Sequence, residues 1–387
     1  MSLAGIAVAC SLAGDMAMYT VLPVIYLDIG MTALQVGVVL AANRFIRFFT
    51  NPLSHYLTRR YPARLLLNGA LITGAAIAFL YGTMPPYAAL IALRLLWGLC
   101  WSVLRQIGIM NASGKALHNR AARMTGIYNG IVRAGFLAGT LLAGFLVDST
   151  EYRIMFAILA AFMAVGTVPA TLAFSRREIV AAARSGHREA EKQPEKASLA
   201  PRSVFQAIKG FVAGSVGSGI VMSTLGYVLK TDVGTTISIG NIVIGVASLN
   251  GILLASRHLV GIAGGPAVGV ALDRIGVMRG EAIAFVGCFL SLSAAFIAPK
   301  TLMIAIAILS FSIFETTAFI ALTTEASRTG RGYTLFATAS DMGAAVGPML
   351  AWTLIETVRL ERIGFAIGAL LYLSAFYLVF IANRKRS

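Results

Sequence analysis

Apolar runs of roughly 20 residues recur from one end of the chain to the other, and each is long enough to cross a bilayer as a helix. Apolar residues make up 58% of the 387 residues and charged residues only 12%, about half the charge of a typical soluble domain. Because lipid offers the backbone no hydrogen-bond partners, such runs must be helical. The sequence therefore predicts an all-α membrane protein.

Twelve such spans are predicted, near residues 4–27, 32–57, 64–83, 87–110, 125–147, 153–174, 205–229, 241–271, 281–298, 301–325, 333–355 and 363–382. Basic residues gather in alternate loops and at the C-terminus: Arg59, Arg60, Arg64, Lys115, Arg120, Arg123, Arg274, Arg279, Arg328, Arg331, Arg384, Lys385 and Arg386. By the positive-inside rule, both termini are expected in the cytoplasm. The net charge of +16 then reports topology, so we expect a protein of the bacterial cytoplasmic membrane that binds no nucleic acid.

One long hydrophilic segment, with mixed charges and two prolines, divides the spans into six and six. We read it as a cytoplasmic linker. The predicted domains are an N-terminal six-helix bundle over 1–175, the linker over 176–203, and a C-terminal six-helix bundle over 204–387.

Two stretches of the chain repeat without a gap. Gly251 registers with Gly37, Pro266 with Pro52, and Arg274 with Arg60. The later stretch ends in the pattern Gly269-x-x-x-Asp273-Arg274-x-Gly276. It resembles the loop motif that follows the second helix of each half in the major facilitator superfamily.

That resemblance, which extends over essentially the whole chain, implies twelve helices in two pseudo-symmetric six-helix halves. It also implies that Gly269, Asp273, Arg274 and Gly276 form a gating motif. The first half departs from the pattern, because His55, Arg59 and Pro62 replace the motif's glycine, aspartate and second glycine. In family members the motif aspartate pairs with arginine and holds the outward-facing state. This pairing is therefore expected only in the second half, through Asp273.

A second repeat supports this organisation. Arg133-Ala-Gly135-x-x-x-Gly139 registers with Asp341-Met-Gly343-x-x-x-Gly347. Glycines spaced by four allow helices to approach closely, so we interpret them mainly as packing residues. The following Pro348 completes a glycine–proline pair that resembles the signature of superfamily exporters, and the fifth span lacks this pair.

Charges within the membrane fall on some spans and avoid others. The interiors of the third, sixth, ninth and twelfth spans have essentially none. Since a buried charge in a bilayer is costly unless it faces partners or water, the charged spans are expected to surround a polar cavity and the others to face lipid. The superfamily fold has the same arrangement.

Two neighbouring spans have polar faces. In the second span a polar stripe repeats every fourth residue, formed by Asn43, Arg47, Asn51 and His55. The repeat partners of the last three are glycines, Gly261, Gly265 and Gly269, and we expect these to pack against the eleventh or fifth helix. In the fourth span, the pattern Arg94-x-x-x-Gly98 resembles the fourth-helix arginine motif of the superfamily.

Basic and aromatic side chains dominate the expected cavity and suit a carboxylate, phosphate or chelator. The candidate substrate-binding residues are Arg44, Arg47, Arg94, Trp97, Trp101, Arg105, Arg133, Arg257 and His258. The candidate proton-coupling residues are Asp15, Glu315 and Asp341, with Asp15 and Glu315 first. Alternatively, each acid is a permanent partner of an arginine such as Arg44, Arg105 or Arg133.

These features predict a secondary transporter that is proton-coupled, works by alternating access and moves a small organic, negatively charged solute. One alternative is a proton-coupled exporter of drugs or amphiphiles, and another is a non-transporting receptor or scaffold of the same fold. No enzyme motif occurs, the four histidines lack metal spacing, and no cofactor or metal is expected. Besides solute, protons and lipid we expect no partner, and hence a monomer.

Overall fold

The computed structural model describes residues 2–114, 121–173, 201–239, 242–327 and 330–384. Its contacts divide the chain into two units. Unit 1 comprises Met1–Met18 and Ile46–Ser198, and unit 2 comprises Tyr19–Phe45 and Leu199–Ser387. The predicted linker 176–203 lies almost wholly outside the described residues, as do Lys115, Arg120, Arg328, Lys385 and Arg386.

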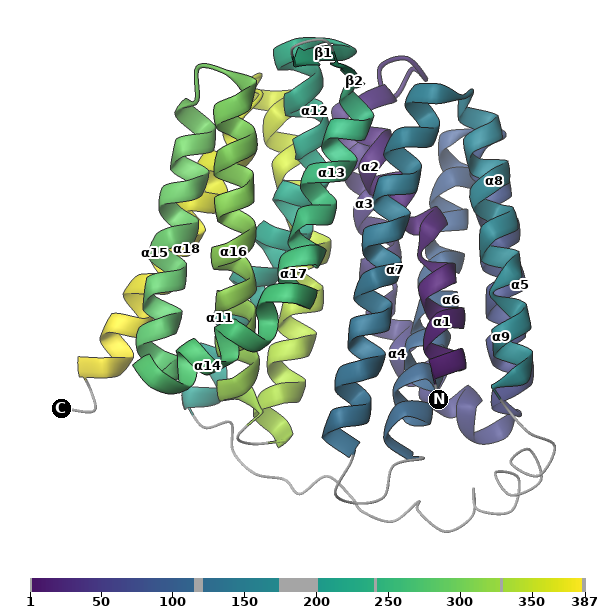
Figure 1. The fold of residues 1–387 in the computed structure, drawn as a ribbon, viewed down its shortest axis with the longest axis horizontal. Coiled ribbons are helices and arrows are strands. Elements are labelled where there is room, and N and C mark those ends of the chain that lie inside the picture. Colours follow the sequence, from purple (N-terminus) through teal and green to yellow (C-terminus); the bar gives the residue numbers. More distant parts are fainter. Residues whose placement is uncertain (1, 115–120, 174–200, 240–241, 328–329, 385–387) are drawn as a thin grey trace. The chain divides into compact units, whose positions relative to one another are not determined.

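Unit 1 is a bundle of antiparallel helices (Figure 1). Its elements are α1 (Ser2–Ser11), the start of α2 (Ala13–Ile25), α4 (Arg47–Arg60), α5 (Ala63–Tyr81), α6 (Tyr87–Gly114), α7 (Ala121–Ser149), α8 (Tyr152–Val165) and α9 (Thr167–Leu172). Helix α1 contacts α5, α6, α7, α8 and α9. It is therefore the centre of this bundle.

Unit 2 contains the remaining helices and one small hairpin. Its elements are the rest of α2, α3 (Ala33–Phe45), α11 (Pro201–Ala213), η2 (Gly214–Val221), α12 (Met222–Val233), β1 (Thr236–Ile239), β2 (Ile242–Gly245), α13 (Val246–Leu259), η3 (Val260–Gly264), α14 (Gly265–Ile275), α15 (Val277–Ile297), α16 (Thr301–Ala326), α17 (Gly330–Val358) and α18 (Ile363–Arg384). Helix α3 packs extensively on α17, which also packs on α11 and η2. These contacts place Tyr19–Phe45, the end of α2 and all of α3, in unit 2.

The predicted spans agree closely with the helices. Nine helices of the described residues are long and apolar enough to cross a bilayer. The other three predicted spans correspond to α3–α4, divided at Ile46, and to α17 and α18. The contact units place Tyr19–Phe45 with the later helices, and the predicted six-helix halves remain a prediction.

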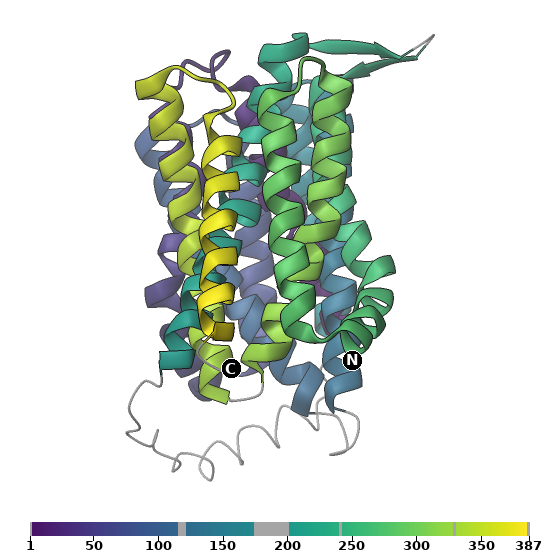
Figure 2. The ribbon, with the colours of Figure 1, turned by 90° about the vertical axis from the view of Figure 1, so that its left-hand side faces the viewer.

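One span boundary was wrong. The eighth span was predicted to begin at residue 241, but the helix begins at Val246 after the antiparallel β1–β2 ladder. The strand residues Ile242, Val243 and Ile244 are apolar and β-branched, which suits a strand. The ladder extends sideways from the ends of α12 and α13 (Figure 2).

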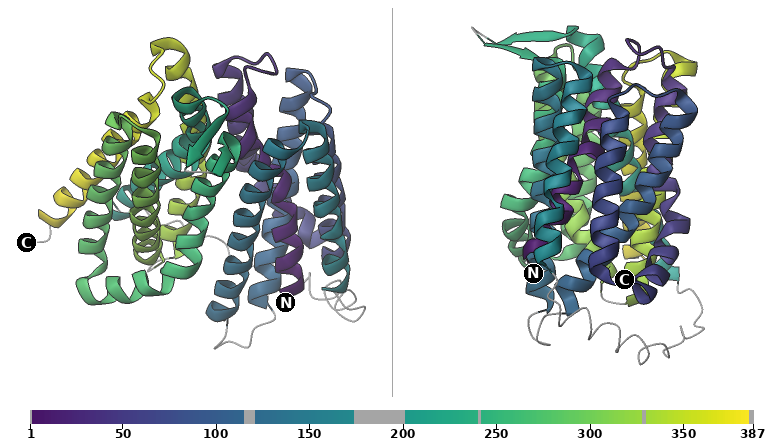
Figure 3. Two further views of the ribbon diagram at one scale, coloured as in Figure 1. Left: turned by 45° about the horizontal axis from the view of Figure 1, so that its top comes forward. Right: turned by 90° about the vertical axis from the view of Figure 1, so that its right-hand side faces the viewer.

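The glycine-rich middle of the eighth span bends the chain. The π-helical segment η3 separates α13 from α14, and α14 turns away from the direction of α13 (Figures 1 and 3). A Cβ at Gly269 would have no atom within 4 Å, and one at Gly265 only Ile320 at 3.9 Å. The close packing expected of these glycines is therefore not found at Gly265 or Gly269, which lie in the interrupted helix.

The other repeated glycines do pack as predicted. A Cβ at Gly135 would lie 2.6 Å from the Cα of Ala9, so α7 approaches the backbone of α1. On α17, a Cβ at Gly343 or Gly347 would meet the backbone of Phe211 or Ser215, respectively. In each unit the glycine pair thus brings two helix backbones together.

Candidate functional site

The π-helical segment η2 lies at the centre of the polar contacts in unit 2. Its sequence, Gly214-Ser-Val-Gly-Ser-Gly-Ile-Val221, is rich in small residues. A Cβ at Gly219 would lie 2.8 Å from the Cα of Gly347, so the segment is pressed against α17. Short π-helical segments occur frequently at functional sites.

Arg44 reaches this segment from the end of α3. Its Nη1 donates to the carbonyl oxygens of Ser218, at 2.7 Å, and Ala344, at 3.3 Å. Its guanidinium carbon lies 4.8 Å from the centre of the Tyr19 ring, a cation–π geometry. Among the described residues no carboxylate forms an ion pair with Arg44.

Arg257 and Glu315 form a two-point ion pair beside the same segment. Nε of Arg257 donates to Oε2 at 2.9 Å, and Nη2 donates to Oε1 at 2.5 Å. Nη2 also donates to the Ser218 hydroxyl at 3.1 Å. Glu315 is 3% exposed and Arg257 20%, so the pair is buried on its acidic side.

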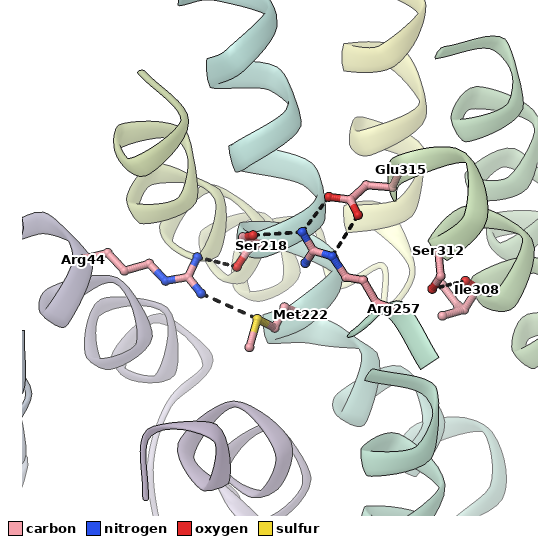
Figure 4. Close-up of polar contacts among 7 residues, drawn as sticks. All are labelled: Arg44, Ser218, Met222, Arg257, Ile308, Ser312 and Glu315. Carbon is pink, nitrogen blue, oxygen red and sulfur yellow. Dashed lines mark hydrogen bonds and ion pairs between the residues drawn. The ribbon is translucent and has the colours of Figure 1, made fainter. Parts of the chain in front are cut away.

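Ser218 therefore connects the two arginines, one through its carbonyl and one through its hydroxyl (Figure 4). Two guanidinium groups and one carboxylate leave an excess of one positive charge in this central site, defined as Arg44, Ser218, Arg257 and Glu315. The fork geometry of arginine matches carboxylate and phosphate groups. The three charged members were predicted from the sequence, whereas Ser218 was not. The glycines and serines around Ser218 could have indicated an irregular, closely packed helical segment.

Unit 1 contains a second buried ion pair. Nη1 of Arg94 lies 2.6 Å from Oδ1 of Asp15, and their side chains are 0% and 5% exposed. Both first-ranked acids are thus paired with arginines, as the alternative interpretation expected. The partners, however, are Arg94 and Arg257 rather than the three arginines suggested.

The polar stripe is divided between the units: Asn43 on α3 accepts a hydrogen bond from Tyr19 at 3.1 Å in unit 2, and the other three members, on α4, face α6 in unit 1. The guanidinium carbon of Arg47 lies 5.6 Å from the ring centre of Trp101. Asn51 accepts a hydrogen bond from Ser102 at 2.9 Å, and His55 lies 3.4 Å from Gln106. Trp97 is also buried, with its ring against Gly74.

Other predicted site residues occupy more open positions. Arg105 on α6, Arg133 on α7, His258 on α13 and Asp341 on α17 are half-buried. In the motif, Asp273, Arg274 and Gly276 are exposed, and no described ion pair includes Asp273. Gly276 has φ of +87° and ends α14. That conformation explains why this motif position favours glycine.

One end of unit 2 is held by contacts that the sequence analysis did not predict. The rings of Tyr26, Tyr227 and Trp352 lie 5.2 to 5.9 Å apart. Beside them Lys230 lies 2.7 Å from Asp28. Burial, with smaller contributions from Tyr227 and Glu356, raises the pKa of Tyr26 to about 12. Its hydroxyl is therefore neutral at ordinary pH. We call Tyr26, Asp28, Tyr227, Lys230 and Trp352 the end clasp.

A sequence profile of the Major Facilitator Superfamily matches residues 4–348. The chain belongs to the major facilitator superfamily. It is an integral membrane protein with a transporter fold, and it is not an enzyme. No curated protein sequence matches it.

Solved structures of superfamily transporters share the fold. A bacterial homologue of the human lysosomal transporter Spinster, inward-facing and occupied, is 14% identical with a TM-score of 0.75, over 99% of this chain and 96% of that one. A variant of the nucleoside transporter NupG is 12% identical with a TM-score of 0.76, over 98% of both chains. A POT family transporter in complex with a thioalcohol-conjugated peptide is 12% identical with a TM-score of 0.73, over 98% of this chain and 94% of that one. At these identities the likeness establishes the twelve-helix superfamily fold.

Proposed function

We propose that this superfamily member is a proton-coupled secondary transporter of a small, organic, negatively charged solute. The observation that supports the solute's charge is the central site, where Arg44 and Arg257 outnumber the single carboxylate of Glu315. A carboxylate or phosphate of the solute binds these two guanidinium groups. The alternative, export of drugs or other amphiphiles, finds less support in a site with excess positive charge.

The two-point ion pair of Arg257 and Glu315 supports the proposed proton coupling. While Glu315 is ionised, it occupies two donors of Arg257. A proton on Glu315 weakens that pairing and frees Arg257 for the solute anion. Asp15, held by Arg94 in unit 1, is the second candidate carrier. Asp341, half-buried on α17, is the third.

Alternating access then requires the end clasp to separate in another state of the protein. Its members come from the turn that follows α2, from α12 and from α17. We assign the moving halves to 1–175 and 204–387, with both termini in the cytoplasm of a bacterium and a monomer as the working unit. Asp273, Arg274 and the two motif glycines then lie at the cytoplasmic ends.

The proton assignment is tested with protein reconstituted in liposomes, using labelled mono-, di- and tricarboxylates and a pH gradient. In Glu315→Gln we expect gradient-driven accumulation to be lost while solute exchange continues, because the neutral amide cannot release a proton. Asp15→Asn is the matched comparison in the other unit. Normal accumulation by both variants would refute proton coupling through these acids.

The solute's charge is tested by ligand-induced thermal shifts. Arg44→Ala and Arg257→Ala should each weaken an anionic ligand by about 1.5–3 kcal/mol, the range for hydrogen bonds to charged groups. Arg359→Ala, in the exposed turn between α17 and α18, is the control and should leave binding unchanged. Stabilisation by cationic amphiphiles alone, undiminished in both site variants, would favour the drug exporter. No flux of any solute would favour a receptor.

A further inference from the structure

A third buried ionic cluster lies in unit 2, formed by side chains of α11, α15 and α16. Lys209 on α11 lies 2.6 Å from Oε1 of Glu281 on α15 and 3.5 Å from Oε2 of Glu325 on α16. The three side chains are 7%, 0% and 10% exposed. This cluster was not predicted from the sequence, because Glu281 lies at the edge of a predicted span and Lys209 lies within an apolar run.

Glu281 is the member whose buried oxygens are least satisfied. It is fully buried, and within the described structure neither carboxylate oxygen has a partner with hydrogen-bond geometry. The close Nζ of Lys209 is an ion-pair contact to Oε1 alone. One helical turn before Lys209, the amide oxygen of Gln206 is also buried without a hydrogen-bond donor. A buried carboxylate in this condition is costly, and each such group requires an explanation.

A proton accounts for these orphaned atoms. A protonated carboxyl becomes a donor as well as an acceptor, so its O–H can be donated to a neighbouring acceptor. It also removes one of the two negative charges that face the single ammonium of Lys209. The proton is taken from water, and an O–H bond forms on Glu281 with no other bond broken.

We propose that Glu281 is a second proton-binding site of this protein, separate from Glu315. Other charged or titratable groups on α15 and on the described elements packed against it are placed as follows. Asp273 and Arg274 on α14, Arg279 on α15 and Tyr377 on α18 are exposed. Glu315 on α16 is bound to Arg257, Cys288 is buried further along α15, and Tyr372 on α18 is buried against Phe285 and Phe311. Occupancy of Glu281 therefore acts on the packing of α11, α15 and α16 through Lys209 and Glu325.

Infrared spectroscopy of the purified full-length protein in nanodiscs tests the site without any transport assay. We expect a protonated-carboxyl band in the wild type that titrates as the pH rises from mildly acidic to mildly alkaline. Glu281→Gln should lose that band, and Glu315→Gln should retain it. A spectrum of Glu281→Gln identical to the wild type across this range would overturn the proposal.

Thermal unfolding gives an independent readout. If folded Glu281 holds a proton that the unfolded chain releases, the folded state binds more protons, so stability falls as pH rises. Glutamine mimics the neutral carboxyl, so Glu281→Gln should fold and lose this part of the pH dependence. Glu361→Gln, on an exposed turn, is the control. An unchanged pH profile in Glu281→Gln would also contradict the site, whereas loss of coupled transport alone would concern Glu315.

Discussion

Gly217 shows how little space the central site leaves at the scale of one residue. A Cβ there would lie 2.5 Å from Oε1 of Glu315 and 3.1 Å from Nη2 of Arg257. The two-point ion pair thus occupies the volume that a side chain would need. The absence of a side chain at 217 is as much a part of the site as the charges are.

We expect Gly217→Ala to separate Glu315 from Arg257 and to reduce transport at least as strongly as Glu315→Gln. Gly69→Ala is the control, because nothing lies within 4 Å of a Cβ at that position on α5. There, alanine should be neutral or should stabilise the helix by up to about 1 kcal/mol. For both variants, transport rates are measured in liposomes and stability is measured as the melting temperature. Wild-type transport by Gly217→Ala would contradict the geometry of the pair.

At the scale of elements, the helices and their number were predictable from the lengths of the apolar runs, because bilayer thickness fixes how long a spanning helix must be. Charged residues also identified three helices of the central site, α3, α13 and α16, but not the segment η2 that carries Ser218. Pairing was not predictable, since Asp15 could face any of several arginines and only three-dimensional packing selects Arg94. The π-helical segments and the β1–β2 ladder depend on tertiary contacts that apolar periodicity does not encode.

The two motif glycines of α14 differ in their physical role. Gly276 adopts φ of +87°, whereas Gly269 is helical with open space around it. Gly276→Ala should therefore cost about 1–3 kcal/mol of stability, the range for a residue held in a sparsely populated backbone region, and Gly269→Ala should cost little or none. Chemical or thermal unfolding of both variants checks this. A larger loss at Gly269 would show that an unrecognised contact forms there.

At the scale of the whole molecule, the end clasp joins the turn after α2 to α12 and α17, and in the transport cycle proposed above it must separate. Trp352 contacts both tyrosine rings and donates from Nε1 to the Ser223 carbonyl at 3.2 Å. A Cβ at Gly37 would lie 2.8 Å from the Cβ of Trp352, so α3 also packs against it. Loss of this residue therefore weakens several contacts at once.

We expect Trp352→Leu to raise amide hydrogen exchange in α3 and at the end of α2, because the contacts that hold this hairpin in unit 2 are weakened. Tyr377→Leu is the control, since Tyr377 on α18 is 62% exposed. Exchange in α1, which belongs to unit 1, should stay unchanged in both variants. Equal exchange of α3 in Trp352→Leu and the wild type would show that the clasp does not depend on this side chain.

The assignment of Tyr19–Phe45 to unit 2 has a consequence for biosynthesis. This hairpin leaves the ribosome long before Leu199 and everything that follows it, yet its packing surface lies on helices made only then. The nascent N-terminal bundle therefore enters the membrane with α3 and most of α2 still lacking their final neighbours. Domains generally fold as units in order of synthesis. Here, the segment Tyr19–Phe45 can reach its final packing only after the later helices have been made. Until then, lipid or chaperones must cover its packing surface.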